Sequence, residues 1–349
     1  MERWRTALGA DPVPWLLEAP DPAVRAATLT HLLDRPDDDP DVTSARAAMA
    51  TDGVVGRVLA TQGPDGHWGE RDRFYRDKYR GTVWQLVVLA ALGCGGADPR
   101  VRAGCEALLR DAQDVESGGF AFDRARTTGG GRHSEVIPCL TGNMVWALVR
   151  LGLLDDPRVQ RGIAWITTYQ RFDTGDGPRP TGWPYDRATS CWGRHTCHMG
   201  AVKALKALAA IPPARRTPEV VATLDAGVAY VLRHHVHKRC HDTSVVAKPG
   251  WLRLGFPLMY QTDVLEVLRI LTDLGVHDPR MGEAVAAVVG KADADGRLTL
   301  EQTLNDRFLA RVEVKGRPSR WLTLEALRML RTAERARPAD PPKPATMAS

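Results

Sequence analysis

A phrase that recurs every ~60 residues constrains the fold of this chain more than any other feature. In each copy an apolar run ends in Leu-Gly, and Asp-Pro-Arg with a further apolar residue follows shortly after. The copies read LGCGGADPRV at 92–101, LGLLDDPRV at 151–159, LGVHDPRM at 274–281 and, in degraded form, IPPARRTPEV at 211–220. Their prolines are 58, 61 and 61 residues apart, at Pro99, Pro157, Pro218 and Pro279. This period predicts a chain built from repeated structural units.

Each copy of the phrase predicts the end of one helix and the start of the next. Glycine favours the position just past a helix end, Asp or Thr caps the following helix, and proline fits its first turn, where no amide donor is needed. The helices before the phrase, at 81–93, 143–152 and 262–275, are apolar nearly all round, which predicts an inner position. The helices after it are amphipathic and predict an outer position, with one stripe formed by Val221, Leu224, Val228 and Val231.

A long glycine-rich loop follows most of the predicted outer helices, at 61–70, 112–120, 169–183 and 291–301. A ring of inner helices within a ring of outer ones would bury both apolar patterns at once. We therefore predict an all-α fold, an α/α toroid of five to six antiparallel helical hairpins, with the long loops on one face. The predicted parts are an N-terminal helical extension at 1–40, the toroid at 41–335 and a disordered, Pro-rich tail at 336–349.

Composition and charge exclude several classes of protein. The first residues lack the apolar core of a signal peptide, and no apolar run approaches the ~20 residues of a membrane span. The net charge of +5 is spread along the chain, which argues against nucleic-acid binding. We expect a cytoplasmic protein without stable membrane insertion, whose six cysteines are reduced. The sequence does not indicate an oligomeric state.

Two of the loops carry a family resemblance. The segments QGPDGHWG at 62–69 and YQRFDTGDG at 169–177 resemble the QW-type repeats of squalene cyclases and of the β subunits of protein prenyltransferases. The resemblance covers roughly 41–333 and implies the toroid fold. Toroids of this kind include terpene cyclases, zinc prenyltransferases and, more distantly, lanthipeptide cyclases, so the resemblance implies a small hydrophobic or isoprenoid-like substrate but leaves the reaction open.

The predicted inner helices begin at the long-loop face, so the residues at their starts would surround one mouth of a central cavity. Several helix N-termini aimed at one cavity favour an anionic group. The side chains predicted to contact substrate at this mouth are Lys78, Arg80, Asn143, Trp192, Tyr260, Gln261 and Trp321. The simpler alternative is that these residues are helix caps, core aromatics and solvated charges. Aromatic residues make up only 6% of the chain, which favours a small substrate over a long folded polyene.

An acid is predicted at Asp263, which begins the apolar helix TDVLEVLRILTDLG. Burial would raise its pKa and the helix N-terminus would lower it, so Asp263 is either a proton donor or an anchoring carboxylate, unless it only caps the helix. His195, His241, Cys139 and Cys197 are the further catalytic residues expected at the same mouth. A thiol at a helix N-terminus has a depressed pKa, and His195 could serve as its base.

Cysteines and histidines also gather in two short segments, SCWGRHTCHMG at 190–200 and HHVHKRCHD at 234–242. Zinc takes such ligands tetrahedrally, and a catalytic site leaves one position open. The Cys followed by a Cys-His pair is similar to the zinc ligands of lanthipeptide cyclases, though at a much shorter spacing. The predicted metal ligands are Cys191, Cys197, His198 and His241. Alternatively, the cysteines are small hydrophobes and the histidines are solvated at a helix end.

Three functional hypotheses follow. The first is a terpenoid-cyclase-like enzyme, a cyclase, isomerase or transferase, that acts on a small hydrophobic or isoprenoid-like and anionic substrate by acid-initiated chemistry. The second is a zinc-dependent transferase or lyase of the prenyltransferase β or lanthipeptide cyclase type, with zinc as its cofactor. The third is a non-catalytic toroid that binds a ligand or peptide.

Overall fold

The structure is a computed structural model of the chain and describes residues 2–304 and 307–336. The described residues form helices joined by loops, with a few short strands, which confirms the predicted all-α class. The α-helices are α1 (Val13–Leu17), α2 (Pro22–Leu32), α3 (Pro40–Met49), α4 (Gly53–Leu59), α5 (Thr82–Ala91), α6 (Pro99–Ala112), α7 (Pro138–Arg150), α8 (Pro157–Tyr169), α9 (His198–Ala209), α10 (Pro218–Arg233), α11 (Val264–Asp273), α12 (Gly282–Val289) and α13 (Arg320–Arg335). None of the described helices has both the length and the apolar character of a membrane span.

The segments outside the α-helices contain short 3-10 helices and strands. The 3-10 helices are η1 (Arg3–Thr6), η2 (Arg71–Arg73), η3 (His133–Glu135), η4 (Pro213–Arg215), η5 (Pro249–Leu252) and η6 (Pro279–Met281). Among the described residues the strands form two antiparallel pairs, β1 (Lys238–Arg239) with β2 (Asp242–Val246) and β3 (Leu298–Thr299) with β4 (Pro318–Ser319).

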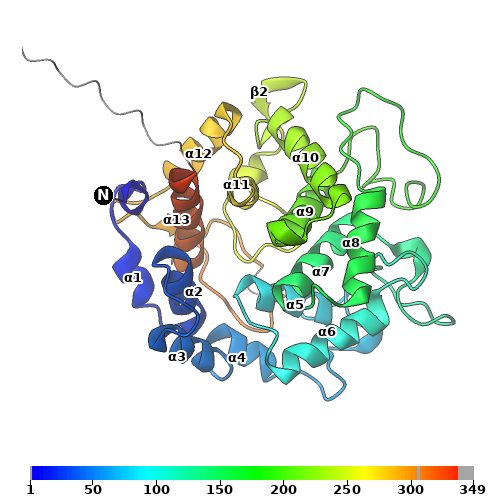
Figure 1. Cartoon of the computed structure of the whole chain (residues 1–349), viewed down its shortest axis with the longest axis horizontal. Helices are drawn as coiled ribbons and strands as arrows, with labels where there is room; N and C mark the ends of the chain where they lie inside the picture. Colours follow the sequence, from blue (N-terminus) through cyan, green and yellow to red (C-terminus); the bar gives the residue numbers. More distant parts are fainter. Residues whose placement is uncertain (1, 305–306, 337–349) are drawn as a thin grey trace, which may run out of the picture.

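The most buried helices contact one another in sequence order around the middle of the molecule. Helix α5 packs on α7, α7 on α9, α9 on α11, α11 on α13, and α13 on α2. Helix α4 contacts both α2 and α5, so this series of contacts closes on itself. We call the helices of this series the inner helices. Figure 1 shows α6, α8, α10 and α12 outside them. The long connections lead from an outer helix into the next inner helix, as the sequence predicts.

The recurring phrase forms the helix boundaries that it predicts. Asp98, Asp156 and Thr217 cap α6, α8 and α10 through their side chains, and proline opens each of these helices. In the last copy, Asp278 caps η6, which leads into α12. The glycine after α5, Gly93, has φ of 73°, a left-handed conformation that other residues rarely adopt.

The apolar stripe of α10 differs from the prediction by one position. Val221 is 44% exposed, whereas Val220, Leu224, Gly227 and Val231 are buried. Gly227 allows the close approach of α9, because a Cβ there would lie 2.4 Å from a methyl carbon of Leu205. The stripe therefore follows the line of closest packing against α9.

The predicted boundary between an extension at 1–40 and a toroid at 41–335 stays a prediction. Helix α2, which lies within 1–40, contacts α13 and α4. The predicted tail at 336–349 falls outside the described residues except for its first position.

Candidate active site

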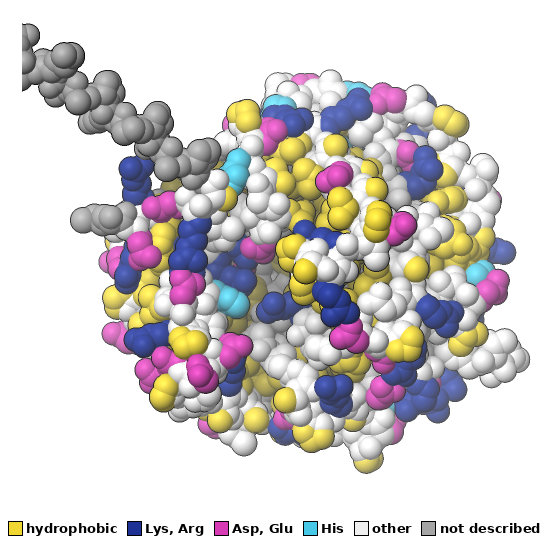
Figure 2. Space-filling model, in the orientation of Figure 1, with side chains coloured by type: hydrophobic (Ala, Val, Ile, Leu, Met, Phe, Trp, Pro, Cys, Tyr) yellow, Lys and Arg dark blue, Asp and Glu magenta, His cyan; other side chains and the backbone are white. Residues whose placement is uncertain are grey.

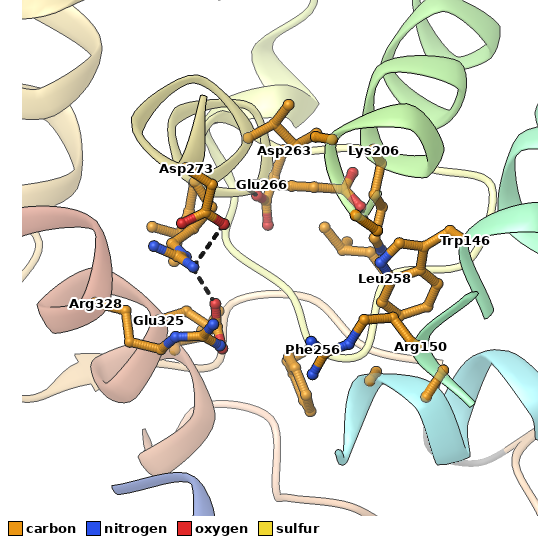
Figure 3. Close-up of a pocket in the computed structure, with 18 of the residues that line it drawn as sticks. Trp146, Arg150, Lys206, Phe256, Leu258, Asp263, Glu266, Asp273, Glu325 and Arg328 are labelled. Atoms are coloured by element: carbon orange, nitrogen blue, oxygen red, sulfur yellow. Dashed lines mark hydrogen bonds and ion pairs between the residues drawn. The ribbon is translucent and has the colours of Figure 1, made fainter. Parts of the chain in front are cut away.

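A cavity of about 200 Å³ lies among the inner helices. Residues of α5, α7, α9, α11 and α13 line it, together with Gly255, Phe256 and Leu258 of the connection before α11 (Figure 3). Much of the helical lining belongs to the last turns, including Ala91, Arg150 and Ala209. In the orientation of Figure 1, Figure 2 shows the surface hollowed near its middle, with Lys and Arg side chains in the hollow.

The sequence analysis expects the site at the N-terminal ends of the inner helices. The lining from α5, α7 and α9 belongs instead to the C-terminal halves of these helices, whereas the lining from α11 and α13 begins at their first turns, with Asp263 and Leu322. Aromatic packing fills the expected mouth. Tyr79 packs against Trp84, Tyr260 and Phe308, and its hydroxyl lies 3.3 Å from the Tyr260 hydroxyl. The ammonium of Lys78 sits 4.9 Å from the ring centre of Tyr260. Lys78, Tyr79 and Tyr260 therefore pack together at the expected mouth, and none of them lines the cavity.

Asp263 lines the cavity and also caps α11. Its two carboxyl oxygens accept hydrogen bonds from the backbone N–H of Glu266 and of Gly255, both at 2.9 Å. The residue is 1% exposed. Burial raises the pKa of Asp263 to about 7, against the opposing effect of the two N–H groups and of Lys203. A large fraction of the carboxyl is therefore protonated at neutral pH.

Glu266, one helical turn further along α11, is held in the ionised state instead. Its carboxylate pairs with the ammonium of Lys203, at 2.7 and 2.6 Å, and with that of Lys206, at 2.9 Å. Burial would raise the pKa of Glu266, but the two ammonium groups outweigh burial and bring it to about 2. Two neighbouring carboxyl groups with pKa values driven apart are typical of sites that use one as an acid and the other as a fixed charge.

Charged side chains continue along the cavity wall. Arg269 pairs with Glu325 at 3.1 Å and with Asp273 at 2.8 Å, and Arg328 pairs with Glu325 at 2.7 Å. Arg150 also lines the cavity, but it makes no ion pair within residues 2–304 and 307–336. Its side chain is exposed. Desolvation by the surrounding protein and the positive charge of Arg328 lower its pKa, against the attraction of Glu325 and Asp273. Arg150 is thus a cation that faces the cavity without a carboxylate partner.

Apolar and aromatic groups form the rest of the wall, notably Trp146, Phe256, Leu258, Leu265 and Leu322. The ammonium of Lys206 lies 3.7 Å from the ring centre of Trp146. The Phe256 ring stacks on Trp321, with ring centres 4.8 Å apart and planes 7° apart. The cavity therefore combines an apolar wall with an acid whose pKa is about 7 and a cation that makes no ion pair among the described residues.

None of the seven residues predicted to contact substrate lines this cavity. Trp321 supports the Phe256 ring from behind, and the Asn143 amide donates to the Met259 carbonyl at 3.1 Å, so both position the lining indirectly. Trp192 is buried against Trp165 and Tyr185. The remaining four are Lys78 and Arg80, which are exposed, and Tyr260 and Gln261, which are partly buried.

The predicted thiols lie together at the start of α9. Cys191 donates a hydrogen bond to Cys197, which lowers the pKa of Cys197 to about 6 with help from the N–H groups of Gly200 and Met199. The direction agrees with the expectation for a thiol at a helix start, but its main cause is the neighbouring Cys191 thiol and not the helix N-terminus. At Cys139, by contrast, burial raises the pKa of the thiol to about 12. His195 lies beside His241, with ring centres 5.6 Å apart.

The four predicted metal ligands do not form one group. His198 stacks on Trp251, with ring centres 4.1 Å apart, and Cys197 pairs with Cys191. Within the described part of the chain, one set of three His, Cys or acidic residues brings its ligand atoms within 4.8 Å of one another. That set is His195, Cys240 and His241, and it includes only one of the predicted ligands.

The sequence analysis missed most of the charged lining. Glu266 and Arg269 of α11 line the cavity, and Lys203 of α9, which pairs with Glu266, is fully buried, although both helices are otherwise largely apolar. A charge in such a helix has to find a partner or a cavity inside the protein, since no face of the helix is solvated. This signal was available in the sequence.

Comparisons with known proteins give a distant likeness. No protein-family model matches the chain, and no curated protein matches it. A protein from Actinoplanes has a similar solved structure, with a TM-score of 0.41 and 18% identity over 90% of each chain. Two structures of the type II terpene cyclase MstE from Scytonema, in complex with geranylgeranyl dihydroxybenzoate, have TM-scores of 0.41 and 0.40. Their identities are 15% and 14%, over 90% of this chain and 88% and 87% of theirs. Likenesses at this level assign no activity to the chain.

Proposed function

We propose that the protein is a terpenoid-cyclase-like enzyme with an α/α toroid fold, in which Asp263 protonates a small hydrophobic or isoprenoid-like substrate that carries an anionic group. The closed series of contacts among the inner helices supports the toroid. The observation that carries the activity is the position of Asp263, a buried carboxyl on the cavity wall whose pKa is about 7.

Asp263 has the surroundings that a proton donor needs. Protonated, it presents an O–H while its oxygens keep their two backbone N–H bonds. The proton moves to one carbon of a substrate double bond, whose electron pair forms the new C–H bond and leaves a cation on the other carbon. The electron pair of the O–H bond remains on the carboxylate, which the N–H groups of Glu266 and Gly255 stabilise. Trp146 and Phe256 line the space beside the cation.

Arg150 is the group proposed to bind the anionic end of the substrate. It is the lining cation that lacks a carboxylate partner among the described residues, so a ligand would not have to break an ion pair to reach it. The cavity volume of about 200 Å³ suits a small substrate. An anionic group at Arg150 and a double bond at Asp263 would fix the substrate in one orientation.

The test uses turnover in deuterated water with C10 and C15 isoprenoid diphosphates and the corresponding isoprenoid acids as probes. The product should gain one deuterium, and Asp263→Asn should lower turnover at least about a hundredfold. Asp156→Asn is the matched control, because it makes the same change at a helix cap outside the cavity and should leave turnover intact. Full turnover in the Asp263→Asn variant, or a product without deuterium, would reject Asp263 as the acid.

The same assay separates the alternatives. Saturable binding of a probe with no product would favour the non-catalytic toroid. Product formation that stops when the protein is washed with chelator, and returns with Zn²⁺, would favour the zinc-dependent transferase or lyase. The His and Cys residues that converge on one point lie outside the cavity lining, so the acid-initiated reaction is the function we propose.

A further inference from the structure

A second cluster of reactive side chains lies away from the cavity, where the connection before α9 meets the segment after α10. His195 ends the first of these segments, and Cys240 and His241 form the turn between β1 and β2. Their ligand atoms all lie within 4.8 Å of one another. His195 and His241 are exposed and Cys240 is partly buried, so the group is accessible from solvent.

The backbone around Thr174 holds the three side chains together. Thr174 pairs with His195 in a β-bridge, and its carbonyl accepts hydrogen bonds from His241 Nε2 at 2.6 Å and from Cys240 Sγ at 3.7 Å. Gly175 permits this arrangement, because a Cβ there would lie 2.5 Å from His195 Nε2. The cluster is therefore built by two segments that are more than forty residues apart in sequence.

A third imidazole, His234, lies near this group. Its Nδ1 lies 2.9 Å from the Lys238 carbonyl, which can only accept, so Nδ1 carries the proton and Nε2 has a bare lone pair. That Nε2 is buried and has no hydrogen-bond partner, and His234 is 7% exposed. Burial lowers the pKa of His234, and the nearby His195 and His241 lower it further. A histidine that donates through one nitrogen and leaves the other bare has the state of a metal ligand.

We propose that His195, Cys240 and His241 bind a divalent transition-metal ion, with Zn²⁺ the preferred metal, and that the unpartnered Nε2 of His234 is a further donor near the site. A site with two imidazoles and a thiolate binds Zn²⁺ in preference to the hard cations Ca²⁺ and Mg²⁺. The Asp176 carboxylate lies 3.9 Å from His241 Nε2 and also pairs with Arg233 at 2.9 Å, so its charge is largely compensated. The bound metal would fasten the connection before α9 to the β1–β2 turn. This proposal does not depend on the proposed function.

Cobalt is the probe for this site, because a thiolate bound to Co²⁺ gives a charge-transfer absorption that histidine alone does not. The full chain is stripped with chelator and titrated with Co²⁺. We expect one equivalent to bind with a sulfur-to-cobalt band and one equivalent of Zn²⁺ to remove that band. Cys240→Ser should abolish the band, and His195→Ala should weaken binding at least about tenfold. Binding without a sulfur-to-cobalt band, or no binding, would overturn the proposal.

Cys197→Ser is the matched control, since Cys197 is partly buried like Cys240 and belongs to the ligand set predicted from the sequence. It should keep the cobalt band. A band lost in Cys197→Ser and retained in Cys240→Ser would overturn the proposed site in favour of the predicted set.

A second measurement needs no variant. Iodoacetamide labelling of the wild-type chain, read by mass spectrometry, should show that Zn²⁺ protects Cys240 from alkylation while Cys197 labels at the same rate with and without metal. Equal labelling of Cys240 in both conditions contradicts the proposal.

Discussion

Asp263 and Glu266 lie one helical turn apart on α11, yet their pKa values are shifted in opposite directions. Both are buried carboxyl groups, but Glu266 is paired with two ammonium groups, whereas Asp263 receives only backbone N–H donors. The pKa values are about 2 and about 7. Partner charge, and not depth, therefore decides which of the two can hold a proton at neutral pH.

The raised pKa of Asp263 makes a prediction about stability. A carboxyl whose pKa rises from 3.8 to about 7 on folding favours the folded state most below its unfolded pKa, and this contribution is lost as the pH rises toward 7. The free energy of unfolding of the wild type, minus that of Asp263→Asn, should therefore fall between pH 4 and pH 7. The fall is roughly 4 kcal/mol at most. Urea unfolding of both proteins across this range measures it, and a pH-independent difference would contradict the raised pKa.

At the scale of single residues, the sequence points to Asp263 but not to Arg150, the cation that lines the same cavity. An aspartate at the start of an apolar helix is recognisable because its position is both capped and buried. Arg150, by contrast, ends α7 like an ordinary basic residue at a helix C-terminus, and nothing in its neighbours shows that it enters a cavity. Its role depends on which helices surround it, which is information that a single sequence does not contain.

At the scale of elements, α7 packs very closely against α9. The sequence analysis does not predict this close approach. Gly142 lies in the first turns of α7, and a Cβ there would lie 2.6 Å from the carbonyl carbon of Lys203 in α9. The obstacle is backbone, which cannot rotate away. Helix caps are local in sequence and could be predicted, but a contact between two backbones sixty residues apart could not.

We predict that Gly142→Ala destabilises the protein by about 1–3 kcal/mol, although alanine is the better helix former, because α7 and α9 must separate. Gly282→Ala is the matched control. Gly282 opens α12, and a Cβ there meets nothing within 4 Å, so alanine should be neutral or stabilising by a few tenths of a kcal/mol. Denaturant midpoints measured with unchanged slope would give both values, and equal effects at the two positions would contradict the close-packing argument.

At the scale of the whole molecule, the repeat period predicts the order of inner and outer helices from α5 to α12, because each copy of the phrase fixes one helix pair. The period is silent on the first ~60 residues, where the phrase does not recur clearly. In the structure these residues meet the end of the chain. The Glu334 carboxylate accepts hydrogen bonds from the backbone N–H of Arg3 and Trp4, and Trp4 also lies under the guanidinium of Arg331. Helix α2 also packs on α13, so segments about 300 residues apart join the two ends of the series.

This junction can be tested at Asp34, which binds two arginines of α13. Hydrogen bonds from Arg335 and Arg331 lower the pKa of Asp34 to about 2. The two arginines differ in burial. The Arg331 side chain is 7% exposed and also donates to the His31 carbonyl at 2.6 Å, whereas the Arg335 side chain is 56% exposed. Water screens the exposed pair, and the buried one leaves a carbonyl without its donor when it is removed.

Arg331→Ala should therefore lower the free energy of unfolding by about 2 kcal/mol, and Arg335→Ala by less than about 0.5 kcal/mol. Thermal and urea unfolding of the two variants compare a buried and an exposed partner of the same carboxylate. If α2 were only an extension that rests on the outside of the helix series, both substitutions should be mild and should leave the main transition unchanged. A large effect confined to Arg331 would instead mean that the contact between α2 and α13 is part of what holds the helices around the cavity.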